Sequence, residues 1–541
     1  MAVNWPGLLS ICVFYMMILA MGIWASRKSK REEKKCTGNR SEVTMVGGAE
    51  PKHLATWVGG GYILGNAEVV YDPTKGLAWA TGPLAFAINL VLGALFFVKP
   101  IRSKNYVTLM DPFQEKYGAK VAAVLFIPAL LGDILWVACI LGALGGTISV
   151  VMDISSALAV CVSAAVAIVY TLMGGLYAVA YTDVVQLSLM LVGLWLCVPF
   201  ILANPSSANI TVAAVTKLHQ EPWLGSLELE EAGRWVDDLL LLAIGGICYQ
   251  AFYQRVLSTA TDAQSKLTCY VAAVLCPILA IPSLIIGAAA ASTNWNETSY
   301  GSPGPYQQGK AGMILPIALQ HLCPFYVSLI GMGALAASVM SSVDSALLSV
   351  ASQLGRNIFK NYLKDFPLLQ ASEKLILAVV KGSIILCGTM GAGLAMTTKS
   401  VHLLWIVSAD VLYSMMAPQV ICIFYLSRRV NHYGACAGFV LSLLLRALVG
   451  EPLIGLPGIL PLPWDKTVDG HRYRLLPFRT AIVLVTMATV LVVSRLASWL
   501  SEKGLLARAS DAEADTAMKY TAPVGTHEEE AERKSSLTVR T

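Results

Sequence analysis

The sequence predicts an all-α polytopic membrane protein with about 13 transmembrane helices, built on an inverted repeat of two five-helix halves. Of its 541 residues, 56% are hydrophobic and 13% are charged, against roughly 25% charged residues in a soluble domain. Apolar runs of about twenty residues, the length that crosses a bilayer, recur from Pro6 to Leu500. Two of these runs are broken by glycine and lie five runs apart. A soluble globular protein is therefore excluded.

The apolar runs divide the chain into four regions. The first transmembrane helix and a basic loop occupy residues 1–53, and the predicted transport core, with the second to eleventh spans, occupies 54–430. Two further helices occupy 431–501, and the charged tail over 502–541 has the composition of a disordered cytoplasmic segment. The candidate spans are 6–25, 54–72, 77–99, 121–150, 155–180, 184–203, 236–256, 267–291, 325–354, 375–397, 401–426, 433–450 and 479–499.

Basic residues set the predicted orientation in the membrane. Six Lys and Arg residues lie between Arg27 and Lys35, directly after the first span, so this loop is predicted to be cytoplasmic and the N-terminus outside. An odd number of spans then places the C-terminus in the cytoplasm. The glycosylation sequons at Asn209 and Asn296 both fall in predicted outside loops, as acceptor sites require. One outside loop conflicts with the charge rule because it carries Lys466, Arg472, Arg474 and Arg479.

The two broken spans indicate where a transported molecule would bind. Gly59–Gly61 adjoin aromatic residues in the second span, and Gly245 and Gly246 precede Tyr249 in the seventh. These are the first helices of two five-helix groups, and an odd number of helices per group inverts the second group. Many secondary transporters bind their substrate between two such discontinuous helices near the membrane midplane. The alternative is that these glycines only allow close helix packing.

Aromatic side chains recur at the depth of these breaks. The five residues are Trp57, Tyr62, Trp136, Tyr249 and Trp405. A quaternary ammonium is attracted to such ring faces by about 2 kcal/mol for each desolvated ring, so the pattern favours an organic cation as substrate. The alternative is an interfacial belt or simple packing.

The ninth span carries a hydroxyl-rich turn with one carboxylate. Ser338, Ser341 and Ser342 precede Asp344 in an otherwise apolar helix. Sodium prefers oxygen ligands, and serine hydroxyls with unwound backbone carbonyls can supply them. A carboxylate inside a membrane is expensive and usually functional. The alternatives are serines bonded to their own helix and an Asp344 paired with a nearby arginine.

Several stretches together resemble a known family. They include the run from Ala55 to Ile63, and the segments 77–80, 106–114, 126–130, 174–186, 254–258, 340–342 and 450–452. In these stretches, which cover nearly all of the chain except the tail, the sequence resembles the sodium/solute symporters, and more narrowly their high-affinity choline-transporting branch. The resemblance implies a leucine-transporter-like fold and sodium-coupled, chloride-dependent choline uptake across the plasma membrane. It also implies that the imported choline supplies acetylcholine synthesis in cholinergic nerve terminals, and that the protein lies in presynaptic and synaptic vesicle membranes.

The resemblance also implies roles for individual residues. Trp57 and Trp136 match aromatic positions around choline, and Ser341 and Ser342 match sodium-binding serines. Asp344 and Glu451 match acidic residues linked to transport. At the outer end of a helix, Glu451 would otherwise be interpreted as a solvated surface charge. The expected partners are choline, sodium, chloride and the lipid bilayer, with no cofactor.

Two departures from the family pattern leave alternatives open. Between Ala49 and Leu54 the chain is shorter and more polar than the half-helix that the family has there, and Tyr249 stands in place of a tryptophan. The first departure motivates a non-transporting membrane sensor or subunit. The second motivates a symporter for another organic cation or small polar solute. An enzyme is not expected, because no nucleophile–base pair or metal ligand set lies at membrane depth, and a net charge of +5 does not indicate a nucleic-acid partner.

Overall fold

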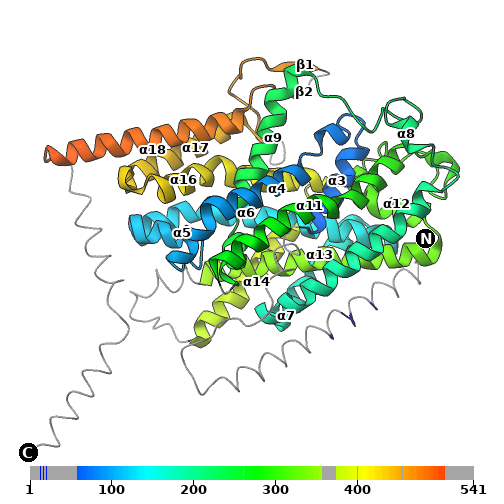
Figure 1. Cartoon of the computed structure of the whole chain (residues 1–541), viewed down its shortest axis with the longest axis horizontal. Helices are drawn as coiled ribbons and strands as arrows, with labels where there is room; N and C mark the ends of the chain where they lie inside the picture. Colours follow the sequence, from blue (N-terminus) through cyan, green and yellow to red (C-terminus); the bar gives the residue numbers. More distant parts are fainter. Residues whose placement is uncertain are drawn as a thin grey trace, which may run out of the picture.

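The computed structural model describes residues 58–259, 261–355, 357, 373–398, 400–451, 455–468 and 471–505, with single positions at 13, 16, 17 and 20. Within these residues the fold is nearly all helical, which confirms the predicted class (Figure 1). Nine of the described helices are long and apolar enough to span a membrane, or ten if one bent pair counts as a single span. Most of the first predicted span, the Ala49–Leu54 segment, Trp57 and the tail from 506 onward lie outside the described residues.

The described part of the first half of the repeat begins at the glycine run. Gly59 is extended, with φ −117° and ψ −167°, and helix α3 starts at the next residue. The helices of this half are α3 (Gly60–Tyr71), α4 (Gly82–Leu92), α5 (Val98–Ser103), α6 (Asp111–Met152) and α7 (Ser156–Leu202), with a π-helical turn at Gly93–Phe97 between α4 and α5. The short α8 (Ile210–Ala213) follows.

Helix α7 covers two of the predicted spans. The sequence predicted separate spans over 155–180 and 184–203, and both lie within the 47 residues of α7. Near its start α7 packs on α6 at Gly145, and the next residue of α6 borders Met313. Just after its end, Asn204 donates to the Leu322 carbonyl at 3.0 Å. Because Met313 and Leu322 are only nine residues apart, both ends of α7 lie on the same side of the bundle, as two successive spans require.

The second half of the repeat is broken where the sequence predicted a break. Segments Leu229–Cys248 and Gln250–Leu257 meet at an angle of 55°, and Tyr249 between them is extended with φ −75° and ψ 136°. The helices of this half are α9 (Ala232–Gly245), α10 (Gln250–Leu257), α11 (Asp262–Ala291), α12 (Ile314–Leu322), α13 (Phe325–Gln353), α14 (Glu373–Ala395), α15 (Val401–Val411) and α16 (Ala417–Tyr425). A π-helical turn, Leu412–Met416, separates α15 from α16.

Two helices follow the repeat and pack against each other. They are α17 (His432–Val449) and α18 (Phe478–Glu502), seen side by side in Figure 1. The connection between them contains a small antiparallel hairpin of β1 (Lys466–Val468) and β2 (His471–Tyr473). This hairpin lies in the loop that the sequence predicted to be outside.

Two long connections on one face of the molecule are paired with each other. The backbone N–H of Ala208 donates to Ser292 O at 3.0 Å, and that of Asn294 donates to Ser206 O at 2.9 Å. The two sequon asparagines lie in these connections, and both are exposed. The two predicted glycosylation sites therefore lie on the same side of the helical bundle.

Candidate functional site

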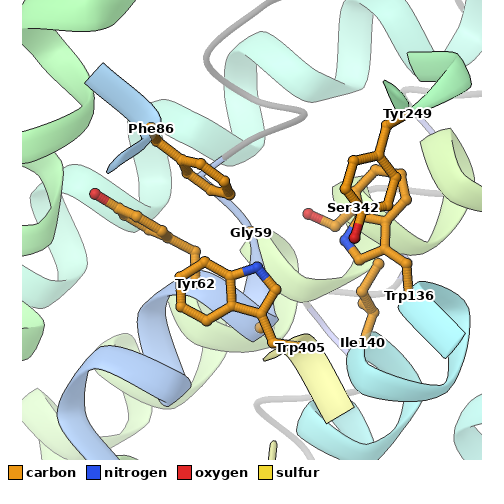
Figure 2. A pocket seen from close by; sticks show the side chains of 9 residues that line it. Gly59, Tyr62, Phe86, Trp136, Ile140, Tyr249, Ser342 and Trp405 are labelled. Carbon is orange, nitrogen blue, oxygen red and sulfur yellow. The ribbon is translucent and has the colours of Figure 1, made fainter. Parts of the chain in front are cut away.

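A cavity lies where the start of α3 and the break before α10 meet the middle of the bundle (Figure 2). Its empty space, including the opening, is about 340 Å³. The lining residues come from the start of α3, from α4, α6, α13 and α15, and from the break before α10; they are Gly59, Gly61, Tyr62, Phe86, Trp136, Ile140, Tyr249, Ser342 and Trp405. Four of the five predicted aromatic residues are thus brought together, and the fifth, Trp57, is among the residues not described.

One wall of the cavity is a cluster of three aromatic rings. Tyr62 stacks on Phe86 with ring centroids 5.4 Å apart, and Trp405 packs edge-on to both, at 5.9 Å and 5.5 Å. The Tyr62 hydroxyl donates to the Cys276 carbonyl at 2.9 Å, which fixes the ring. Gly82 makes room for this cluster, because a Cβ atom there would lie 2.6 Å from Trp405 Cη2.

The opposite wall is a pair of rings from α6 and the second helix break. Trp136 and Tyr249 have centroids 5.2 Å apart. The Tyr249 hydroxyl is hydrogen-bonded to Ser408 Oγ at 2.5 Å, inside the protein. Tyr249 therefore has a partner for its polar atom on α15 and contributes a ring face to the cavity.

Sequence reasoning missed Phe86 in the cavity. Phe86 lies in the predicted span 77–99, which is mostly apolar, and its immediate neighbours are both alanine. A phenylalanine in such a span is normally lipid-facing or core packing. The sequence signal that could have revealed it is Gly82, one turn earlier. The absence of a side chain at Gly82 makes room for the Trp405 ring.

Of the three predicted sodium-site serines, one faces the cavity. Ser342 lies directly against the extended backbone at Gly59, just before α3, because a Cβ atom at Gly59 would be only 1.6 Å from Ser342 Oγ. This hydroxyl is buried and has no hydrogen-bond partner within the described part of the chain. Ser341 Oγ instead donates to Asp183 Oδ1 at 2.5 Å, and Ser338 Oγ donates to the Met190 sulfur at 3.3 Å.

Two buried carboxylates lie beside these serines. Asp344 Oδ1 accepts from Thr171 Oγ1 at 2.8 Å, while its Oδ2 atom meets no donor among the described residues. Asp183 forms an ion pair with Arg255 at 2.9 Å. The structure thus pairs the nearby arginine with Asp183, a residue that the sequence analysis missed, and pairs Asp344 with a hydroxyl.

Glu451 lies in a separate buried network of charges, apart from the cavity. It forms an ion pair with Arg446 of α17, which also pairs with Asp410 of α15 at 2.8 Å. Arg479 of α18 pairs with Asp410 at 3.3 Å and with two carboxylates of α9, Asp238 at 2.6 Å and Asp237 at 3.7 Å. Glu451 is therefore not a solvated surface charge.

This network also explains part of the conflict between the charge rule and the basic residues of the last predicted outside loop. Arg479 was counted there as a loop residue, but it lies within α18, and its side chain is 15% exposed and neutralised by aspartates. Arg474 donates to the Val449 carbonyl. Neither guanidinium is a free loop charge of the kind that the charge rule counts.

Comparison with known proteins agrees with this architecture. The chain matches the sodium:solute symporter family over residues 36–442. It is 44% identical to high affinity choline transporter 1 of Homo sapiens, over 99% of this chain and 92% of that protein. It is 39% identical to high-affinity choline transporter 1 of Drosophila melanogaster, over 93% of this chain and 80% of that protein.

A solved structure supports the fold independently. A Na+-coupled sialic acid symporter in a substrate-bound outward-open state superposes with a TM-score of 0.67 at 19% identity, over 91% of this chain and 98% of that chain. This likeness concerns the fold alone and confirms the predicted leucine-transporter-like architecture. The relatives are transporters and not enzymes. With its family match over most of the chain and its full-length relatives, the protein belongs to the sodium:solute symporter family.

Proposed function

We propose that this protein takes up choline across the plasma membrane by coupling its entry to sodium. The observation that carries the proposal is the cavity lining: among the described residues it has five aromatic rings and no charged side chain. Such a surface suits a quaternary ammonium, which cannot donate a conventional hydrogen bond and is attracted to ring faces. The choline-transporting relatives support the same substrate.

Ser342 and the extended backbone at Gly59 support a sodium site beside the cavity. Their close approach brings a buried hydroxyl without a partner next to backbone that is not helical, which is the kind of oxygen environment that sodium prefers. The adjacent Ser341 donates to Asp183 at 2.5 Å, and Asp344 follows two residues after Ser342 on α13. Sodium bound here would hold α3 against α13. Sodium entry would therefore depend on the arrangement of the two helices beside the cavity. Ser338, bonded to the Met190 sulfur, is the weakest of the three predicted ligands.

The Tyr249 hydroxyl is already engaged inside the protein. Its bond to Ser408 Oγ on α15 uses one of its hydrogen-bonding positions. The ring still offers its face opposite Trp136. Replacing an indole by a phenol weakens attraction to a cation, and a loss of about 1.4 kcal/mol would lower affinity tenfold.

The wider setting follows from the same proposal. The N-terminus lies outside and the C-terminus in the cytoplasm, with Asn209 and Asn296 glycosylated on the outer face. Transport requires chloride and supplies acetylcholine synthesis in presynaptic terminals, where the protein also resides in synaptic vesicle membranes. The membrane potential assists inward movement of each positive charge by about 2.3 kcal/mol per 100 mV.

The first experiment is uptake of radiolabelled choline by cells that express the full chain, in sodium and in lithium medium, with surface biotinylation. Sodium-dependent uptake that unlabelled choline inhibits better than other organic cations supports the proposal. Preferred inhibition by another organic cation favours that solute instead. Choline binding to the purified protein without sodium-dependent flux favours a sensor or subunit.

Removing one ring of the cavity provides the sharpest mutational test. We expect Trp136→Ala to raise the choline KM at least tenfold at unchanged surface level, because it deletes a desolvated ring worth about 2 kcal/mol. Trp499→Ala is the matched control, since that tryptophan is 48% exposed at the end of α18. A normal KM in Trp136→Ala would refute binding of choline by the aromatic walls.

A further inference from the structure

A stripe of polar residues leads away from the cavity along one face of α13. Ser342, Ser345, Ser349 and Gln353 follow one another at spacings of three or four residues, which places them on the same side of the helix. All four are buried. The stripe begins at the cavity, with Ser342, and ends at Gln353, the last residue of α13. In the proposed orientation that end is cytoplasmic.

Helix α10 lines the same stripe with polar groups. Arg255 donates to Ser345 Oγ at 2.9 Å, and Ser349 Oγ donates to Gln254 Oε1 at 3.1 Å. Polar side chains at membrane depth usually face the bundle interior or an aqueous pathway, because contact with lipid would leave them unsatisfied. The interface of α13 with α10 is thus polar at Ser345 and Ser349, in the middle of the stripe.

Helix α6 contributes one carboxylate to this region. Asp133, Trp136 and Ile140 lie on one face of α6, at spacings of three and four residues, and the latter two line the cavity. Asp133 is therefore one turn beyond the aromatic wall, toward the N-terminal end of α6. That end is cytoplasmic in the proposed orientation.

Asp133 and Gln353 meet across α6 and α13, and their pairing is incomplete. Gln353 Nε2 donates to Asp133 Oδ2 at 2.7 Å; Gln353 is 1% exposed and Asp133 is 2% exposed. Asp133 Oδ1 and Gln353 Oε1 are both buried and receive no hydrogen bond from any described residue. Two buried oxygens, one of them on a carboxylate, thus have no donor and no positive partner among the described residues, which is unfavourable unless a cation or proton lies beside them.

We propose that Asp133 and Gln353 form a second, transient binding station for the quaternary ammonium on its way from the aromatic cavity to the cytoplasm. The inference rests on the function proposed above, since it needs an organic cation as cargo. A permanent cation that leaves the ring faces enters a low-dielectric interior, where a carboxylate one turn away lowers the electrostatic barrier. Fast passage requires a site that is attractive enough to enter and weak enough to leave.

This proposal predicts that binding and turnover respond differently to mutation of Asp133. We expect Asp133→Asn to lower the maximal rate of choline uptake about tenfold at equal surface level. Equilibrium choline binding to the purified protein should change less than twofold, because Asp133 does not line the cavity. Asp133→Glu, which keeps the charge, should retain at least a third of the maximal rate. Thr147→Val is the control: Thr147 is also buried on α6 but bonds to its own helix at Ala143 O.

The possible outcomes separate this inference from the proposed function. If the maximal uptake rate of Asp133→Asn is within twofold of wild type, the proposed second binding site is refuted. It is also refuted if Asp133→Glu loses as much of the maximal rate as Asp133→Asn. A change in the sodium concentration for half-maximal uptake, without a lower maximal rate, also overturns it, because the pair would then serve sodium. If Asp133→Asn fails to reach the surface, Gln353→Met takes its place with an expected threefold lower rate and unchanged binding. A wild-type chain that neither binds nor transports choline overturns both proposals.

Discussion

Two buried carboxylates flank the aromatic cavity, and their surroundings differ. Glu68, on α3, has both oxygens satisfied: one accepts from Ser400 Oγ at 2.5 Å and the other from the backbone N–H of His402 at 2.9 Å. Asp133, on α6, accepts one hydrogen bond, from Gln353, and its other oxygen has no donor in the described part of the chain.

This difference separates a structural role from a transport role. Glu68 joins α3, in the first half of the repeat, to the N-terminus of α15, in the second half, where orphan backbone N–H groups favour an anion. It thereby holds the start of the helix that carries Trp405, whose ring packs edge-on to His402 at 6.1 Å. Among the described residues Asp133 accepts a single hydrogen bond, and its second oxygen can still interact with a positive charge. We expect mutation of Glu68 to affect stability and mutation of Asp133 to affect turnover.

The largest effect on stability is expected from Glu68→Ala. The substitution leaves the Ser400 hydroxyl and the His402 N–H without their acceptor, and hydrogen bonds to a charged group contribute about 1.5–3 kcal/mol each. The purified protein should unfold at a clearly lower temperature, and less of it should reach the cell surface. Glu228→Ala, at an exposed loop glutamate, is the control. Equal unfolding temperatures for the two variants would contradict the structural role.

A smaller effect is expected from Ser400→Ala. This change removes the donor to Glu68 and also the N-cap of α15, where Ser400 Oγ accepts from Leu403 N at 3.0 Å. Loss of a serine N-cap costs about 1 kcal/mol. Thermal unfolding should place this variant between wild type and Glu68→Ala, while Ser400→Thr, which keeps a hydroxyl, should lie close to wild type. A variant as unstable as Glu68→Ala would mean that the cap, and not the carboxylate, joins the two halves.

The smallest effect on stability is expected from Asp133→Asn. It changes one hydrogen bond and removes a buried charge that has no cationic partner among the described residues, so the two contributions oppose each other. Its unfolding temperature should differ from wild type by less than that of Ser400→Ala, even though its transport rate falls. A drop as large as that of Glu68→Ala would show that both carboxylates are structural and would remove the contrast between them.

The sequence predicts much of the fold because membrane insertion leaves strong local signals. Apolar runs define the spans, and the Gly245–Gly246 pair marks the break before Tyr249, since glycine is a poor helix former. Asp183 lies at the predicted boundary between the two spans within α7, where a charge interrupts the apolar run. Its pairing with Arg255, 72 residues later, keeps it inside the helix bundle.

The site was predicted less completely because its key contacts are distant in sequence. Tryptophan and tyrosine near a glycine break attract attention, whereas Phe86 in an apolar span does not. The bonds from Ser400 to Glu68 and from Gln353 to Asp133 join residues 332 and 220 positions apart. No local pattern reveals such partners, so neither carboxylate was singled out.

The ion pairs of Arg479 have a consequence for how the protein is made. Asp237 enters the membrane with α9, but Arg479, which donates to it, is 242 residues further along the chain. At roughly 5–20 residues per second, the ribosome needs on the order of 10–50 s to synthesise that stretch. During this interval the α9 carboxylates must stay hydrated or be held by the insertion machinery. The outer half of the second broken helix can therefore reach its final position only after α18, the last helix among the described residues, has been inserted.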